Sequence, residues 1–450
     1  MVRGLSEKVV LELAQRKKEP KWVTDLRLKA LKAWEKLEMP NWGPKLDGLH
    51  LDQIETYIKP QQEMVKSWTK VPKEIRETFE KLGIPEAERA ALGGVGAQYN
   101  SEMIYFRLKK QVEARGVVYL PMEEAIRSRR RLLIDNEWKE VRSLVREYFM
   151  KIVPSESYKF MALHGAVWSG GSFIYVPKKA VVEVPLQAYY RLNAPGAGQF
   201  EHSLIIVDEE ADLSFIEGCS APRYNVANLH VGCVEVMVKK GARLKFATVD
   251  SWSKNVFNLS TKRALVDERG MIDWVTGSFG SQVSMLYPTT ILRGEGAKMT
   301  FKGISMAGSG QNLDTGMRVV HLAHKTCSNI NLKSLIKDGG ISTTRSFVKI
   351  AKEARGVRNF LDCQSLILDE KSRADAVPEI KVLSDEAEVG HEAAVGQISE
   401  EEIFYLKSRG LSEEQARVLV VRGFTEGVVS ELPVEYAREM NRLIELEIQK

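Results

Sequence analysis

The chain has 450 residues, with 65 Lys or Arg, 60 Asp or Glu, four cysteines and 44% hydrophobic residues. Four cysteines in so long a chain exclude a disulfide scaffold, and the ordinary apolar content excludes wholesale disorder. The net charge of +5 gives no indication of nucleic acid as a partner. No apolar run is long enough to cross a membrane, and the N-terminus lacks the apolar core of a signal peptide. A cytoplasmic protein is therefore expected.

Residues 1–154 are predicted to form a helical N-terminal domain. Ser6 is placed to cap a first helix, and apolar side chains recur every three or four positions over Leu26–Leu37, which is typical of a second helix. Further helices are predicted over residues 72–82 and 122–150. The last of these carries the basic run RSRRR. We interpret that run as a solvated helix face, because no aromatic residues accompany it to stack on bases.

Residues 155–397 change to short alternating stretches that are typical of strands. Each stretch follows a charged turn with a small residue, and these turns recur at Ala211, Ala242, Gly270 and Ala297, at intervals of 31, 28 and 27. Later turns follow one another at about half that interval. A full interval of about 28 residues with turns at half that interval is expected of stacked coils that contain two strands each. A mainly β protein with a solenoid, or parallel β-helix, core is therefore predicted. An antiparallel sandwich of hairpins is the alternative.

Residues 398–450 return to a helical pattern with a net acidic charge. Ser399 and Ser412 each precede a Glu or Gln by three positions, which is the signature of a capping box at the start of a helix. The second of these helices is expected to stop at Gly423, and Pro433 suits the first turn of a last helix. This C-terminal domain is expected to be either a cap on the solenoid or a docking surface.

The motifs of ordinary enzymes are missing. There is no phosphate-binding loop, zinc protease motif or nucleophile elbow, so neither nucleotide hydrolysis nor a common hydrolase is indicated. Cys219 ends a predicted strand and enters a turn, where its thiol is expected to be accessible. His391 and Glu392 offer an imidazole and a carboxylate side by side. The alternatives are a buried core thiol and a hydrogen-bonded histidine beside a solvated carboxylate. Cys233 and Cys327 are interpreted as core thiols.

Four long stretches, which contain motifs such as EGCSAP and GHEAAVGQIS, resemble the SufB/SufD family of the SUF iron–sulfur cluster assembly system. The N-terminal opening and the His-Glu pair favour the SufB branch. The resemblance implies a right-handed parallel β-helix between helical end domains. It also implies that the C-terminal helices bind SufC, the ATPase of the system, and that the late β-helix pairs with SufD or a second SufB copy. The stretches are residues 4–37, 160–222, 345–382 and 390–433.

The resemblance also implies roles for individual residues. Cys219 matches the cysteine that accepts persulfide sulfur from a desulfurase system, and His391 and Glu392 match the region that supplies ligands to iron in a nascent cluster. The chain has Ser372 in a stretch where bacterial SufB proteins carry a cysteine, and a serine hydroxyl is a poorer iron ligand than a thiolate. Cys363 is the candidate that takes its place as a ligand.

The expected function is therefore scaffolding in a SufBCD-type complex rather than turnover of a small molecule. A transient iron–sulfur cluster would be held weakly by mixed ligands and passed to apoproteins, with ATP hydrolysis on SufC. Two other functions stay open at this point. One is a SufD-like structural partner without cluster ligands of its own, which the serine at position 372 favours. The other is a polysaccharide-binding or lyase-type β-helix, although no acidic and aromatic sugar groove is evident.

Overall fold

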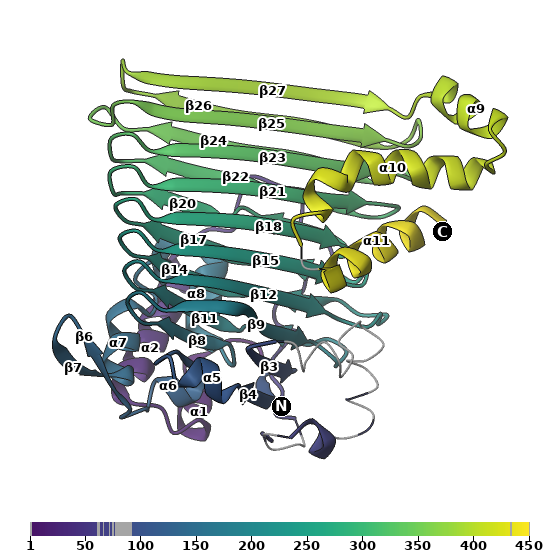
Figure 1. Ribbon diagram of the computed structural model, residues 1–450. Coiled ribbons are helices and arrows are strands. Elements are labelled where there is room, and N and C mark those ends of the chain that lie inside the picture. The colour runs from purple at the N-terminus through teal and green to yellow at the C-terminus, as the bar shows by residue number, and fades with distance from the viewer. Residues whose placement is uncertain are drawn as a thin grey trace.

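A computed structural model describes residues 2–60, 64–65, 67–71, 73, 76, 92–432 and 434–449. Its centre is a parallel β-helix that rises from the N-terminal elements to the last strands, β26 and β27 (Figure 1). Helices lie at the N-terminal end and against one side of the coil. The predicted mainly β solenoid with helical flanks is confirmed.

Each coil contributes a strand to each of two large sheets. The strands of the first sheet are β9 (Val181–Arg191), β12 (Asp212–Ser220), β15 (Arg243–Ser251), β18 (Met271–Phe279), β21 (Lys298–Ala307), β23 (Cys327–Ile336), β25 (Val357–Ile367) and β27 (Ala387–Gln397). Those of the second are β8 (Ser172–Val176), β11 (His202–Val207), β14 (Cys233–Val238), β17 (Thr261–Val266), β20 (Thr289–Leu292), β22 (Asn312–His321), β24 (Ile341–Ile350) and β26 (Arg373–Val382).

The early coils have a third, short side. Its strands are β10 (Gly198–Gln199), β13 (Asn228–His230), β16 (Val256–Asn258) and β19 (Val283–Leu286). Both β19 and β20 pair with β22, so the short side merges into the second sheet and the later coils are flatter. Only the early coils therefore enclose residues from three sides.

The strand register reproduces the period of the sequence. Asp212 pairs with Arg243, Arg243 with Met271 and Met271 with Lys298, so the offsets are the predicted intervals of 31, 28 and 27. The anchor residues of the turns come directly before these strands. Ala242 is 1% exposed and packs in the main hydrophobic core.

Alternate residues of each strand point into the coil, as the pleat requires. Aromatic rings contact one another along the stack, and the ring centroids of Phe215 and Phe246 lie 5.2 Å apart. One line of inward-facing residues, called here the interior column, runs in register from the early coils to the last. Its members are Phe215, Phe246, Trp274, Phe301, Ile330, Leu361 and His391.

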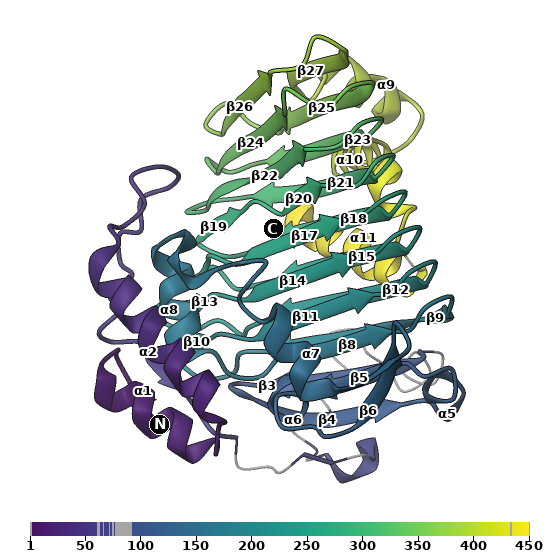
Figure 2. The same cartoon turned by 90° about the vertical axis from the view of Figure 1, so that its left-hand side faces the viewer.

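The N-terminal region combines helices with strands. Helices α1 (Glu7–Arg16) and α2 (Lys21–Lys36) form as predicted, and the Ser6 hydroxyl accepts the Val9 amide. Strands β3 (Gly94–Tyr99), β4 (Glu102–Leu108) and β5 (Val118–Pro121) continue the two core sheets downward. Every residue of helix α8 (Lys159–Val167) after Lys159 is buried. The N-terminal end of the β-helix is thereby covered, as Figure 2 shows.

The helix predicted over residues 122–150 is wrong. The chain forms a short helix α6 (Met122–Ala125), a hairpin of β6 (Arg131–Ile134) and β7 (Glu137–Glu140), and a helix α7 (Val141–Tyr148). Asp135 and Asn136 have φ angles of 51° and 64°, which suit a tight hairpin turn and interrupt a helix. Most of the helix predicted over residues 72–82 falls outside the described residues.

The C-terminal helices are α9 (Glu400–Ser408), α10 (Glu413–Val429) and α11 (Val434–Gln449). Ser399 caps α9, and Ser412 begins α10 with a complete capping box. The stop predicted at Gly423 is wrong, because α10 continues past it while Val428 and other apolar residues pack against the first sheet. None of the helices in the described residues is long and apolar enough to span a membrane.

Candidate functional site

Cys219 lies inside the β-helix. Strand β12 continues to Ser220, so Cys219 belongs to the strand and faces the interior, and its side chain is 2% exposed. The expectation that a turn makes this thiol accessible is wrong. The reason is the register: Cys219 is flanked by Tyr190 below and Asp250 above, and both neighbouring strands extend as far as β12 does.

Two residues from the short third side come close to this thiol. The ligand atoms of Cys219, Glu201 and His230 all lie within 4.8 Å of one another. His230 Nε2 is 2.5 Å from Glu201 Oε1, and its Nδ1 is 2.8 Å from Asn258 Oδ1. The indole of Trp252 packs against the imidazole, with ring centroids 4.5 Å apart. We call the surroundings formed by Cys219, Glu201, His230 and Trp252 the chamber. Hydrogen bonds at both ring nitrogens fix the orientation of His230 beside the thiol.

Sequence reasoning missed Glu201 and His230. A weak signal was present, because Gln199, His230 and Asn258 occupy one register position on β10, β13 and β16. These strands are too short to show an alternating pattern. A polar residue that recurs at the period of the coil is the signal that could have identified this third side.

The electrostatics of the chamber keep the thiol protonated at rest. Burial raises the pKa of Cys219 well above its ordinary value, and the nearby carboxylates of Asp250 and Glu217 raise it further. Lys262 acts in the opposite direction and forms a buried ion pair with Glu217. Burial alone would lower the pKa of Lys262, but Glu217 and Asp250 outweigh burial and raise it. A charged ammonium thus remains beside the thiol, where it favours a negative charge on sulfur.

The pKa of His230 follows the same balance. Burial alone would lower it, but the carboxylate of Glu201 outweighs burial and raises the pKa of this imidazole. His230 and Glu201 therefore form a buried, hydrogen-bonded pair next to a thiol. Such a pair can exchange the proton that the thiol must lose before its sulfur becomes nucleophilic.

An internal cavity extends from this chamber toward the later coils. Its lower end is lined by Asp250 and Lys262 and its upper end by Leu332 and Ser334. Asp250 is in register with Cys219, and Leu332 is in register with Cys363. Neither cysteine lines the cavity itself: Cys219 lies one strand below its lower end and Cys363 one strand above its upper end. Hydroxyl groups line much of its wall, from Thr248, Ser260, Thr276, Ser278, Ser305, Thr315, Ser334 and Thr344.

Cys363, His391 and Glu392 lie on the last two strands of the first sheet. Cys363 is 5% exposed, and burial raises the pKa of its thiol to about 12, with a further contribution from Asp362. His391 and Glu392 are exposed on β27. Cys363 is in register with Ala393, so strand alternation points His391 to the same inner side as Cys363 and Glu392 to the outer side.

Ser372 has a structural position in the turn before β26. Its hydroxyl donates to Asp369 Oδ2 at 2.7 Å and accepts the Gly339 amide at 3.1 Å. Burial alone would raise the pKa of Asp369, but hydrogen bonds from Ser372 and from backbone amides outweigh it and lower that pKa. The hydroxyl is thus committed to holding the turn.

The structure separates the expected site residues into two groups. From β12 to β27 the first sheet advances by six strand spacings, or about 29 Å at ~4.8 Å each. Cys219 is therefore far from His391 and Glu392, and only Cys363 is near that pair. Of the cysteines interpreted as core thiols, Cys233 is fully buried and Cys327 is half-buried.

Comparisons with known proteins identify the family of the chain. Residues 190–424 match the family model described as "SUF system FeS cluster assembly, SufBD core domain". The chain is 46% identical over 447 residues to the iron–sulfur cluster assembly protein SufB of Bacillus subtilis (strain 168), covering 99% of this chain and 94% of that protein. Identity and coverage are the same for an iron–sulfur cluster assembly SufBD family protein of Staphylococcus epidermidis.

Proposed function

The chain belongs to the SufBD family of iron–sulfur cluster assembly proteins, and on that premise we propose that it is an assembly scaffold. In this proposal Cys219 accepts sulfur, the internal cavity connects it with Cys363, and a labile cluster forms at the open end beside His391 and Glu392. The observation that carries the proposal is that two buried, inward-facing cysteines flank one internal cavity, each one strand beyond a residue that lines it.

The first step is transfer of sulfane sulfur from a donor persulfide. The Cys219 sulfur attacks the terminal sulfur of the donor, the donor's S–S bond breaks, and the donor leaves as a thiolate. No net oxidation occurs, because one persulfide replaces another. The proton of Cys219 passes to the adjacent His230–Glu201 pair and then to the leaving thiolate. Lys262 favours the negative charge that develops on the Cys219 sulfur.

The donor must reach a thiol that is 2% exposed. Residues 221–227 follow Cys219 closely in the chain and connect β12 to β13, and of these residues Ala221 is buried whereas Val226 is 49% exposed. We expect the loop to open when a donor binds, because few buried side chains hold it. Access of the donor, rather than intrinsic reactivity of the thiol, would then select the partner.

The second step takes place at the open end of the β-helix. Cys363 supplies a thiolate, and the exposed His391 and Glu392 supply an imidazole and a carboxylate to iron. These mixed ligands hold a cluster less firmly than four thiolates, which suits a product that must leave. The last strand is an unpaired edge, and such edges invite pairing with another chain. SufD or a second copy of this chain is the partner proposed here.

The C-terminal helices are the proposed docking surface for SufC, on which ATP would be hydrolysed. Phe404 and Tyr405 on α9 are 74% and 57% exposed. A groove between α9 and α10 is lined by Glu401, Tyr405, Leu419 and other residues. Exposed aromatic rings beside carboxylates are suited to a protein interface. Deletion of residues 398–450 should abolish SufC binding, and retained binding would refute this assignment.

The test of the proposal is sulfur transfer followed by anaerobic cluster reconstitution. Cys219→Ser should lose protein-bound sulfane sulfur after incubation with a persulfide donor, and should build no cluster from it. Cys363→Ala should accept sulfane sulfur normally but lose the cluster absorbance and its Mössbauer signal. Cys327→Ser, a half-buried cysteine away from the cavity, is the matched control. Unchanged sulfur uptake in Cys219→Ser would sink the proposal, whereas a wild-type chain that builds no cluster would favour a SufD-like structural partner.

A further inference from the structure

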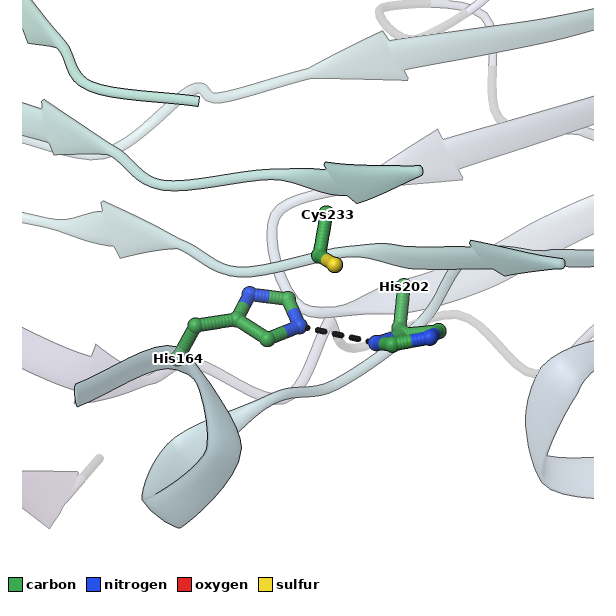
Figure 3. A group of neighbouring side chains, drawn as sticks. All are labelled: His164, His202 and Cys233. Atoms are coloured by element: carbon green, nitrogen blue, oxygen red, sulfur yellow. Dashed lines mark hydrogen bonds between the residues drawn. The ribbon is translucent and has the colours of Figure 1, made fainter. Parts of the chain in front are cut away.

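A second cluster of buried donor groups lies outside the coil, between the second sheet and helix α8. His164 comes from α8, His202 from β11 and Cys233 from β14 (Figure 3). His202 and Cys233 are register partners and point away from the interior toward the helix. All three side chains are 0% exposed, and their ligand atoms lie within 4.8 Å of one another.

The hydrogen bonds of the two imidazoles define where their protons are. His164 Nδ1 is 2.7 Å from the Val231 carbonyl oxygen. That oxygen can only accept, so Nδ1 carries the proton and Nε2 presents a lone pair. His202 Nε2 is 2.9 Å from Glu235 Oε2, and the Glu235 carboxylate already accepts the amides of Met150 and Val153 at 2.6 and 2.7 Å. His202 Nε2 therefore donates to this carboxylate.

The remaining two nitrogens face each other. His164 Nε2 and His202 Nδ1 are 3.0 Å apart, as the dashed line in Figure 3 shows, and the Cys233 sulfur lies beside them. A shared proton or a cation must join these nitrogens, since two lone pairs at that distance repel. Histidines that bind a metal characteristically donate their other N–H to a carbonyl or a carboxylate. Both histidines here have that partner already.

We propose that His164, His202 and Cys233 bind one divalent transition-metal cation, of which Zn²⁺ is the best fit. Two imidazole nitrogens and one thiolate are a donor set that Zn²⁺ accepts in tetrahedral sites, at about 2.0–2.1 Å to nitrogen and ~2.3 Å to sulfur. The two nitrogens need to separate by only a few tenths of an ångström to reach tetrahedral geometry. The thiol of Cys233 gives up its proton on binding.

The site is separate from the proposed sulfur path. Cys233 and Glu235 lie on the outer side of β14, whereas Val234 and Val236 between them face the coil interior. The metal would tie α8 to the first coils, and Glu235 adds the loop that contains Met150 and Val153. Its role is therefore to hold the N-terminal region against the β-helix, not to supply the cluster.

The other cluster of donor groups is a weaker candidate for a metal. In the chamber of Cys219, both nitrogens of His230 already have oxygen partners, Glu201 on one side and Asn258 with Ser260 on the other. No lone pairs are forced together there. The structure thus distinguishes a chamber built for proton exchange from a cluster built for a cation.

The test measures metal in the full chain as purified, and in protein produced with Co²⁺ in the medium. The wild type should contain about one equivalent of zinc, and the cobalt form should show a thiolate-to-cobalt charge-transfer band. Cys233→Ser should lose that band, and its metal content should be at least tenfold lower than that of the wild type. Cys219→Ser and Cys327→Ser should keep both. His321→Gln should also keep both. It is the control for loss of a buried histidine outside the cluster, because both ring nitrogens of His321 form hydrogen bonds with hydroxyl groups.

Zinc X-ray absorption of the wild type keeps the proposal testable if a variant fails to fold. It should show two nitrogen neighbours and one sulfur neighbour, with one water oxygen completing a four-coordinate shell. A shell of oxygen atoms alone would overturn the proposal. So would a wild-type chain that carries less than a tenth of an equivalent of metal, or a charge-transfer band that survives in Cys233→Ser and disappears in Cys219→Ser.

Discussion

The two ends of the β-helix differ in how they are covered. At the N-terminal end, helices and added strands bury the first coils, and side chains as large as Trp168 and Phe149 are at most 1% exposed. At the other end, β27 has exposed residues on both of its faces. Val395 points inward in register with Ser365 and is nevertheless 53% exposed. Figure 2 shows the two ends at opposite extremes of the coil.

The chain therefore buries its own apolar side chains at the N-terminal end of the β-helix, whereas it leaves the strand at the other end exposed. The interior column consists of apolar residues from Phe215 to Leu361. It ends in His391, whose polar ring is exposed to solvent. His391 and Glu392 on the last strand are therefore exposed, at the end where the proposal above places a partner chain. Four predictions test this contrast, beginning with the largest expected effect.

A charge placed at the open end should abolish assembly with the partner chain. Val395→Asp would bury an unpaired carboxylate in the proposed interface, which costs several kcal/mol, so association should weaken by at least a hundredfold. Analytical ultracentrifugation of the chain alone and with SufD measures this. Val181→Asp on β9 is the matched control, because Val181 is 47% exposed at the covered end. Equal association of both variants with the wild type would place the partner elsewhere.

Replacement of the buried Lys262 by an uncharged residue should destabilise the covered half of the molecule. Lys262→Met leaves Glu217 without its ion-pair partner inside the coil, and loss of one member of a buried pair costs about 3–5 kcal/mol. Urea unfolding should show this loss of unfolding free energy. The double variant Lys262→Met with Glu217→Gln should recover most of it, because no buried charge is left unpaired. A single variant as stable as the wild type would mean that the pair is hydrated.

A fall in pH should lower the unfolding free energy through His321, a buried histidine of the later coils. Burial lowers the pKa of His321 from 6.5 to about 4, so the folded state holds a neutral ring while the unfolded chain takes up a proton. Its contribution to stability is therefore complete above pH 6.5 and is lost as the pH falls toward 4, by about 3 kcal/mol in all. His321→Gln should flatten that part of the profile of unfolding free energy against pH. An unchanged slope would contradict the lowered pKa.

The smallest effect is expected on the C-terminal helices. Gly423 lies within α10, and a Cβ there would meet no atom within 4 Å. Gly423→Ala should therefore raise the unfolding free energy by about 0.5–1 kcal/mol, because alanine loses less backbone entropy in a helix. Gly277→Ala is the contrasting variant, since its Cβ would lie 2.3 Å from the Met440 Cε atom. It should loosen the contact of α11 with the first sheet, and thermal unfolding should separate the two variants.

The repeat of the coil could be predicted from the sequence because it is a local property. Each coil needs a turn with a small residue at its corner, and Ala211, Ala242 and Ala297 reveal the period before any contact is known. The helix caps at Ser6, Ser399 and Ser412 are local in the same sense. An N-cap hydroxyl that accepts an amide three residues on stabilises the start of a helix. The family resemblance rests on such stretches of continuous sequence.

The surroundings of Cys219 could not be predicted in this way. Glu201 and His230 meet Cys219 only because three sides of the coil converge on it, and Lys262 reaches Glu217 across 45 residues of chain. The accessibility expected of Cys219 failed for the same reason, since strands on both sides bury a residue that sequence alone places near a turn. The continuation of α10 past Gly423 depends likewise on packing against another element.

The sequence by itself therefore determined the period, the caps and the family, and it supplied the candidate site residues, because each depends on residues close together in the chain. Only the tertiary structure decided which of those side chains share a chamber, which thiols are buried and which end of the coil stays open. Those properties depend on the register between coils and on what covers each end, and neither is a property of any single segment.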